Sequence, residues 1–276
     1  CSDNNFIFLG PNPDIIDSMG NKAKAKQTMQ KAGVPVVPGG EGVLDGPEEA
    51  LLKANQMGYP VMLKASAGGG GRGMRFVKKE SEVISAFKSA NQEALTAFGN
   101  GDIYIEKFIE NPRHIEVQIL GDSFGNVIHL GERECSIQRR HQKLIEESPS
   151  PLVDSITRDK IGDAAVKGAK AVNYIGVGTI EFLMDKDKNF YFMEMNTRIQ
   201  VEHPVTEMVT GVDLIKQQIL MHSGEKISEP SKLKLTGHSI ECRINAEDPS
   251  NNFLPFPGKI NSFHMPGGKG VRIDSH

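Results

Sequence analysis

The sequence predicts an α+β fold in which antiparallel strands pair with each other and helices cover them. Three observations support this class. Runs of alternating apolar and polar residues, the pattern of half-buried strands, cover 115–120 and 127–132. Two further strand-like runs, 179–184 and 190–195, flank a short polar turn, which is typical of a β-hairpin. A stretch with helical spacing, 157–173, lies between these two sets of strands.

The composition is that of a folded protein with more than one structural unit. The 276 residues are many for one compact core, while 38% hydrophobic and 24% charged residues are ordinary globular values. A formal net charge of −3 argues against a surface that wraps nucleic acid. No apolar run reaches the roughly 18 residues that a membrane span needs. Three widely spaced cysteines predict neither a disulfide framework nor a zinc site.

The remaining elements follow along the chain. Residues 6–9 form an apolar run ended by a Gly-Pro pair, which favours a short strand. A helix-like run follows and is stopped by Gly33 and Pro35. The next region reads as a small α/β module, and a β-rich region opens at His238. The expected helices are 22–31, 47–57, 81–98 and one beginning near 212–213, and the further expected strands are 61–64, 74–77 and 103–107.

Glycine is enriched, at 29 of 276 residues, and one cluster of glycines stands out. Residues 68–73 read Gly-Gly-Gly-Gly-Arg-Gly, but a strand follows the run instead of the helix that a dinucleotide or Walker motif requires. We therefore expect the tip of a hairpin between 61–64 and 74–77. Glycine lets backbone N–H groups approach an anion closely, and Lys64 and Arg72 add positive charge, so we interpret the run as a flap over a polyphosphate. A flexible surface loop is the alternative.

A pair of glutamates is expected on one face of the 179–195 hairpin. If Leu183 lies opposite Phe192, then Glu181 lies opposite Glu194, and Asn196 shares their face. Two facing carboxylates repel each other unless a cation lies between them, and oxygen ligands favour Mg²⁺ or Mn²⁺. The alternative is a solvated strand face.

The residues after this hairpin offer groups for a small anionic substrate. Arg198 can bind a planar anion with two hydrogen bonds, Gln200 can donate, and Glu202 can accept a proton. We interpret His203 as a structural residue and expect Pro204 to break the run before the helix that begins near 212–213. A basic cluster upstream has two open interpretations, a charged site and a solvated edge or interface; it comprises Arg133, Arg139, Arg140, His141 and Lys143 around Gln138.

Several motifs together make the sequence resemble the biotin carboxylases of the ATP-grasp superfamily. The most diagnostic string is 198–207, and the similarity runs over essentially the whole chain. The other matching stretches are 64–66 with the glycine run, 106–109, Glu181, 194–198, 138–143 and 241–248. The family extends further at both ends. The resemblance implies an ATP-grasp fold of two α+β subdomains that grip ATP, with remnants of flanking domains.

The resemblance also implies a division of the chain and a set of ATP-binding residues. The expected parts are the end of an N-terminal domain (1–35), a lid subdomain with the glycine flap (36–108), a central subdomain with the metal and bicarbonate site (109–234) and the start of a C-terminal domain (235–276). The implied ATP-binding residues are Lys22, Lys64, Gly69, Gly70, Gly71, Met74, Glu106, Lys107, Phe108, Ile109, His114, Gln138, His141 and Leu183.

The implied chemistry is the ATP-dependent carboxylation of biotin by bicarbonate, through carboxyphosphate. Glu181, Glu194 and Asn196 would bind Mg²⁺ or Mn²⁺. Bicarbonate would lie against Lys143, Arg198, Gln200 and Val201, with Glu202 as the base, and Arg243 would stabilise the biotin enolate.

The implied partners are a biotin carboxyl carrier protein or domain, a carboxyltransferase component and, in the full-length protein, a second copy in a homodimer. We expect no nucleic-acid or membrane partner. The expected role is in acetyl-CoA carboxylase and hence in fatty acid synthesis. The expected location is the bacterial cytoplasm, or an organelle if a transit segment has been removed. Two alternatives stay open: another ATP-grasp ligase, and a nucleotide-binding fragment without turnover.

Overall fold

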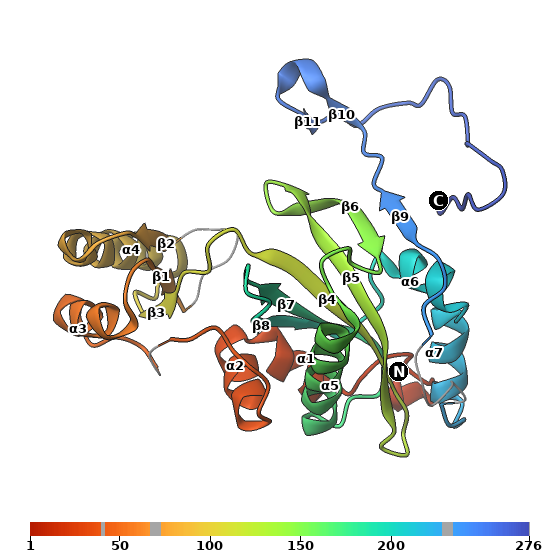
Figure 1. The fold of residues 1–276 in the computed structure, drawn as a ribbon, viewed down its shortest axis with the longest axis horizontal. Helices are drawn as coiled ribbons and strands as arrows, with labels where there is room; N and C mark the ends of the chain where they lie inside the picture. Colours follow the sequence, from red (N-terminus) through yellow and green to blue (C-terminus); the bar gives the residue numbers. More distant parts are fainter. Residues whose placement is uncertain (40–41, 67–72, 228–233, 276) are drawn as a thin grey trace. The chain divides into compact units, whose positions relative to one another are not determined.

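The computed structural model describes the chain except for residues 40–41, 67–72, 228–233 and 276. The chain divides into two units, residues 1–241 and 242–276, which are described separately (Figure 1). The finer four-part division stays a prediction. In the described residues no helix is long and apolar enough to cross a membrane. Gly69, Gly70 and Gly71, which the resemblance implies as ATP-binding residues, lie outside the described residues.

The first unit contains a six-stranded antiparallel sheet that carries most of the candidate site. Its strand order is β8-β7-β4-β5-β6-β9. The hairpin predicted from 179–184 and 190–195 is present, as is a strand over each of the two alternating runs. The strands are β4 (Arg113–Gly121), β5 (Val127–Arg139), β6 (Gln142–Ser148), β7 (Gly176–Met184), β8 (Phe190–Asn196) and β9 (Ser239–Cys242).

Helices cover both faces of this sheet. On one face the helices α1, α2 and α5 bury alternate residues of β4 and β7, including Ile119, Ile180 and Phe182. On the other face α7 packs over Leu120 and Val177, and α6 lies against β5 and β6. The helices are α1 (Pro13–Gly20), α2 (Lys22–Lys31), α5 (Ser155–Ala171), α6 (His203–Thr210) and α7 (Leu214–His222).

A smaller three-stranded sheet, order β2-β1-β3, has an apolar core of its own. As predicted, β1 pairs with β2, and Lys64 lies opposite Met74. Gly73, which enters β2, has φ +69°, and a Cβ there would lie 2.6 Å from the Ala65 Cβ, so the turn into β2 requires glycine. The elements are α3 (Pro47–Met57), β1 (Val61–Ala65), β2 (Met74–Val77), α4 (Val83–Phe98) and β3 (Ile103–Lys107), with a 3₁₀ turn at Glu80–Glu82 before α4.

Two of the expected features are wrong. Residues 6–9 are not a strand: Phe6 and Ile7 are 71% and 68% exposed, and no described strand pairs with them. An apolar run forms a strand only where a neighbouring edge accepts its hydrogen bonds. Pro204 does not break the chain before the next helix. It lies in the first turn of α6, where its missing N–H costs nothing.

The helices α1 and α6 and the strand β6 were not predicted. The basic cluster is in fact a hairpin of β5 and β6, turned by Arg140 and His141, which both have positive φ. The second unit, residues 242–276, contains little regular structure. Its elements are β10 (Glu247–Asp248), a 3₁₀ turn (Pro249–Asn251) and β11 (Leu254–Pro255), and β10 pairs with β11.

The packing of α5 predicts which of its isoleucines contributes to the free energy of unfolding. Ile161 is fully buried against the sheet, whereas Ile156 on the same helix is 66% exposed. We expect Ile161→Ala to lower the free energy of unfolding by about 2–5 kcal/mol, because it leaves a cavity, and Ile156→Ala to change it by less than about 0.5 kcal/mol. Urea titration followed by circular dichroism measures both, and equal losses would contradict this packing.

Candidate functional site

Strand alternation places polar side chains of β4 on the sheet face opposite its apolar core. Ile115 and Val117 point into the core under α5. The residues between and beside them, His114, Glu116 and Gln118, therefore point to the other face. Glu116 and Gln118 are fully buried there, so the face is a closed polar layer and not a solvated surface.

The neighbouring strand β7 adds Glu181 to the same face. Glu181 lies opposite Glu194 of β8, as predicted, but Leu183 lies opposite Tyr191 and not Phe192. The register changes after Glu181, where β8 contains one extra residue, a β-bulge. The glutamate pair was thus predicted correctly, although the half of the hairpin next to the turn was not.

Arg133 of β5 lies inside this layer and is fully buried, which excludes the interpretation of Arg133 as part of a solvated edge. Its Nε donates to Glu116 Oε1 at 2.6 Å. Burial opposes the charge of both groups. The carboxylate nevertheless raises the pKa of Arg133, and Arg133 together with Lys143 lowers the pKa of Glu116. Both residues are therefore charged.

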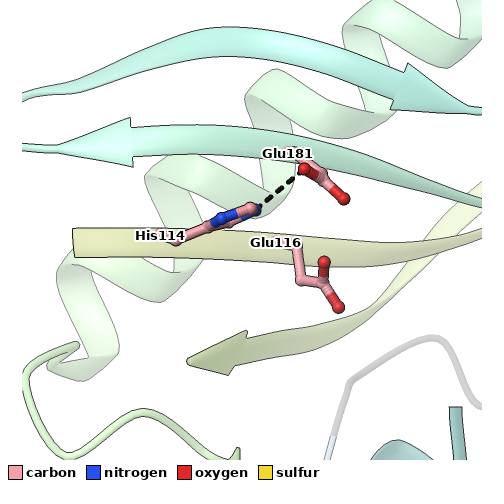
Figure 2. A group of neighbouring side chains, drawn as sticks. All are labelled: His114, Glu116 and Glu181. Atoms are coloured by element: carbon pink, nitrogen blue, oxygen red, sulfur yellow. Dashed lines mark ion pairs between the residues drawn. The ribbon is translucent and has the colours of Figure 1, made fainter. Parts of the chain in front are cut away.

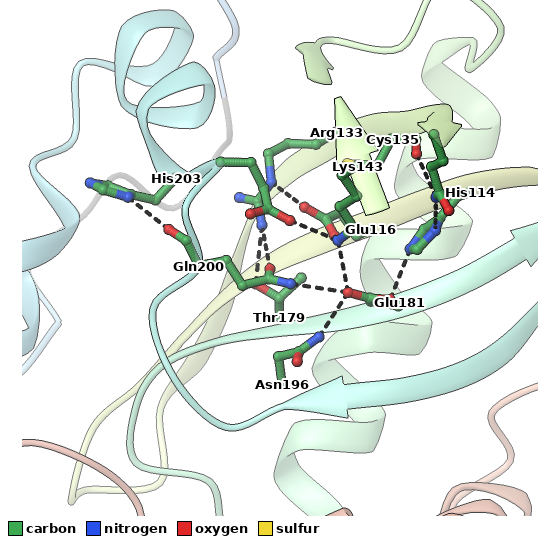
Figure 3. A network of polar contacts seen from close by, with 12 residues as sticks. His114, Glu116, Arg133, Cys135, Lys143, Thr179, Glu181, Asn196, Gln200 and His203 are labelled. Carbon is green, nitrogen blue, oxygen red and sulfur yellow. Dashed lines mark hydrogen bonds and ion pairs between the residues drawn. The ribbon is translucent and has the colours of Figure 1, made fainter. Parts of the chain in front are cut away.

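Lys143 of β6 lies at the centre of the site (Figure 3). Its Nζ donates to Glu116 Oε2 at 2.5 Å, to Glu181 Oε1 at 2.9 Å and to Glu202 Oε1 at 2.7 Å. Burial would lower the pKa of Lys143, but the carboxylates, Glu116 most strongly, raise it. One ammonium group thus uses its three donors on three buried carboxylates.

Glu181 is the most heavily bonded of these carboxylates. Its Oε1 also accepts from Asn196 Nδ2 at 2.7 Å and from Gln200 Nε2 at 3.0 Å. Its Oε2 lies 2.8 Å from His114 Nε2 (Figure 2). Burial raises the pKa of Glu181, but His114 and Lys143 outweigh burial and hold the pKa at about 2. Glu181 is therefore ionised at neutral pH.

Gln138 connects β5 to this group. Its Nε2 donates to the Cys135 carbonyl at 2.7 Å and lies 2.8 Å from His114 Nδ1. Because Nδ1 accepts a hydrogen bond from the Gln138 amide, His114 is oriented with Nε2 toward Glu181. His141, by contrast, lies exposed in the β5–β6 turn.

The segment after β8 brings its residues to different places. Gln200 and Glu202 are buried, at 6% and 2% exposure, and Glu202 is the residue at the N-cap of α6. Val201 is 60% exposed. The Arg198 Nη1 donates to the Ile199 carbonyl at 3.1 Å. His203 Nδ1 lies 2.8 Å from the Gln200 carbonyl, which fits the structural role expected for it.

The predicted ATP residues of the smaller sheet have partners of their own. Lys64 Nζ donates to Glu106 Oε2 at 2.5 Å, and Lys26 of α2, which the sequence did not single out, donates to Oε1 at 2.7 Å. Burial raises the pKa of Glu106, but the two lysines lower it. Lys107 Nζ donates to the carbonyl of Gly58 at 2.9 Å, just after the end of α3. Lys107 therefore holds the end of a helix.

The other predicted ATP residues have simpler surroundings. Phe108 donates its backbone N–H to the Pro60 carbonyl at 3.2 Å, Met74 is 37% exposed, and Leu183 is half-buried on β7. Lys22 Nζ lies 3.8 Å from Glu194 Oε2. Arg243 belongs to the second unit, so its role toward biotin stays a prediction.

Some buried side chains lie close enough together to share a metal ion. Two such groups occur among the described residues: His114, Glu116 and Glu181, and Glu116, Cys135 and Glu202. Lys143 contacts the glutamates of both groups and so supplies positive charge already. Burial raises the pKa of the Cys135 thiol well above its usual value, which disfavours a thiolate ligand.

The predicted metal residues fit a hard cation by their chemistry. Glu181 and Glu194 are directly opposite on adjacent strands, and Asn196 adjoins them. Glu194 is 38% exposed, and among the described residues its ion pair is with Lys22, at 3.8 Å. Glu194 therefore offers carboxylate oxygen that is only loosely paired, and oxygen is the ligand type that Mg²⁺ prefers.

Five residues of the site were missed from the sequence: Lys26, Glu116, Gln118, Thr179 and Thr206. The alternation His-Ile-Glu-Val-Gln over 114–118 is a signal that could have identified two of them, because a strand beside the acid pair shares its polar face. Lys26 and Thr206 lie on helices, and no local pattern points to them.

Comparison with known proteins gives the same family throughout. Residues 21–230 match the family described as carbamoyl-phosphate synthase L chain, ATP binding domain, and residues 241–276 match the biotin carboxylase C-terminal domain. The biotin carboxylase of Nostoc sp. is 61% identical over the whole chain, which covers 62% of that relative. The chain thus spans about three fifths of its relative's length.

Two solved structures are similar in fold. The Campylobacter jejuni biotin carboxylase in complex with β,γ-ATP has a TM-score of 0.88 and 58% identity, over 99% of this chain and 61% of that one. The biotin carboxylase domain dimer of Hydrogenobacter thermophilus 2-oxoglutarate carboxylase, in complex with MgADP, ADP and bicarbonate, has a TM-score of 0.87 and 53% identity, over 99% and 60%. The chain has the ATP-grasp fold and belongs to the biotin carboxylase family.

Proposed function

We propose that this chain is the nucleotide- and bicarbonate-binding part of an enzyme that carboxylates biotin at the expense of ATP. The observation that carries the proposal is the largely buried Lys143, held by three carboxylates beside Gln200. A largely buried cation, an amide and a buried carboxylate that lie together can orient a small anion and accept its proton.

Glu202 is the proposed base. Its carboxylate is 2% exposed, and Lys143 holds it in the site at 2.7 Å. In the proposed reaction a Glu202 oxygen takes the bicarbonate proton, and the bicarbonate oxygen attacks the γ-phosphorus of ATP, which gives carboxyphosphate and ADP. Carboxyphosphate then releases phosphate and CO₂ beside the biotin ureido nitrogen. Lys143, Arg198 and Gln200 would hold the carboxyl oxygens throughout.

The nucleotide would lie between the two sheets' polar residues, with Lys64 and Lys22 as its phosphate ligands. Glu106 holds Lys64 at 2.5 Å, so the phosphate would compete with a carboxylate for that ammonium. Mg²⁺, held by Glu181, Glu194 and Asn196, would neutralise phosphate charge during the transfer. The MgADP bound by the Hydrogenobacter domain supports this assignment.

The final acceptor of the carboxyl group is a finer proposal. We propose acetyl-CoA, and hence a role in fatty acid synthesis, with a biotin carboxyl carrier protein and a carboxyltransferase as partners. The similarity to a domain of 2-oxoglutarate carboxylase supports a keto acid as the competing acceptor. That domain is described as a dimer, which supports a homodimer of the full-length protein.

The proposed reaction predicts a substrate dependence. We expect the full-length protein to hydrolyse ATP only with bicarbonate, and free biotin to accelerate the reaction and become carboxylated. Phosphate release and ¹⁴C-bicarbonate fixation measure the two effects. ATP hydrolysis indifferent to both bicarbonate and biotin would contradict the proposal and favour another ATP-grasp ligase.

The proposed base predicts a loss of turnover without a loss of nucleotide binding. Glu202→Gln keeps the side-chain shape but removes the proton acceptor, so we expect kcat to fall by roughly 10²- to 10⁴-fold. Calorimetry should show an unchanged affinity for Mg-ATP, because Glu202 is not a phosphate ligand. Glu225→Gln, an exposed site after α7, is the matched control. Turnover by Glu202→Gln comparable to that of the control would remove the assignment.

The proposed metal pair predicts a magnesium dependence. Glu194→Gln removes one charge from a half-exposed carboxylate, so the fold should persist while the Mg²⁺ concentration for half-maximal activity rises by about 10-fold or more. A titration of activity against free Mg²⁺ at saturating ATP gives this value. An unshifted titration would favour the alternative, a strand face without a metal.

A further inference from the structure

Arg133 is a buried cation to which the proposed reaction assigns no role. It lies on β5 with none of its side chain exposed. Burying a guanidinium costs several kcal/mol unless its charge is balanced and its donors are bonded. The partners of Arg133 must therefore offset the cost of burying its charge.

All five N–H donors of Arg133 are used, each on a different residue. Nε donates to Glu116; Nη1 donates to Gln118 Oε1 at 2.6 Å and to Thr206 Oγ1 at 2.9 Å; Nη2 donates to Thr179 Oγ1 at 3.1 Å and to Gln200 Oε1 at 2.9 Å. The partners come from β4, β7, α6 and the segment between β8 and α6. A single planar group thus joins four parts of the first unit.

Two of these bonds orient groups of the proposed bicarbonate site. Because Arg133 holds the Gln200 oxygen, the amide nitrogen of Gln200 must point the other way, and it donates to Glu181 at 3.0 Å. Because Arg133 holds Glu116 Oε1, the second oxygen of Glu116 is left for Lys143.

A third bond reaches the helix that carries the proposed base. Thr206 lies in the first turns of α6, and Glu202 is the residue at the N-cap of the same helix. The bond from Arg133 to the Thr206 hydroxyl therefore fixes the start of α6 against β5. Thr179, in contrast, lies on β7, which the sheet already holds on both sides.

We propose that Arg133 is a positioning residue for the bicarbonate site, which sets the orientation of Gln200, Lys143 and Glu202 without touching the substrate. This inference rests on the proposed function. It is selective, since none of the five hydrogen bonds goes to Lys64, Glu106 or any other described residue proposed for ATP on the smaller sheet.

The test is Arg133→Lys in the full-length protein. Lysine keeps the charge that Glu116 requires but has three donors in place of five, so Gln200 and α6 lose their fixed geometry. We expect kcat/KM for bicarbonate to fall by roughly 10- to 100-fold, while the calorimetric Kd for Mg-ATP stays within about twofold. A bicarbonate kcat/KM within about twofold of wild type in a folded variant overturns the proposal, as does an equal loss toward both substrates.

A second pair of variants applies if Arg133→Lys does not fold. Thr206→Val and Thr179→Val each remove one buried hydroxyl acceptor of Arg133 at nearly constant volume. The proposal requires the larger loss of bicarbonate kcat/KM in Thr206→Val, and Thr206→Ser should restore it. Equal effects would show a structural role only. Absence of bicarbonate-dependent ATP hydrolysis in the wild type would instead contradict the proposed function.

Discussion

The ion pair between Arg133 and Glu116 is the constraint on which the rest of the site depends. Both side chains are fully buried, at 2.6 Å from each other. An unpaired charge in this position would cost several kcal/mol, so neither residue can be removed alone without penalty. The pair leaves the second oxygen of Glu116 to accept from Lys143 and the other donors of Arg133 to bind its neighbours, including Gln200. These bonds build the candidate site.

Ion pairs within the buried layer hold the site together. Glu116, Glu181 and Glu202 are surrounded by the two cations Arg133 and Lys143. Carboxylates held close together repel one another strongly at low dielectric. Lys143 lies among all three and offsets this repulsion. Glu194, opposite Glu181 on the adjacent strand, is ion-paired more loosely than these three carboxylates, at 3.8 Å from Lys22. The position of the Lys143 ammonium and the proposed position of a metal ion are therefore consequences of one charge distribution.

Local sequence patterns predicted most of the helices and strands and the acid pair, because those depend on the periodicity of apolar residues along single segments. The hairpin of β7 and β8 aligns Glu181 with Glu194 even though a bulge changes the register toward the turn. The site beyond this pair depends on long-range contacts. Arg133 contacts Thr206 across 73 positions of sequence, and arginine in a charged run is ordinarily exposed. Its burial follows only from the acceptors that β4, β7 and α6 bring together, which no local pattern encodes.

Neutron diffraction from deuterium-exchanged, ligand-free crystals of the full-length protein tests the central claim most directly, because it locates the hydrogens of Arg133 and distinguishes the oxygen of Gln200 from its nitrogen. The account predicts five N–H groups of Arg133 directed at Glu116, Gln118, Thr206, Thr179 and Gln200, with the Gln200 oxygen facing the guanidinium. A guanidinium bonded to water, or a Gln200 amide in the opposite orientation, would contradict it.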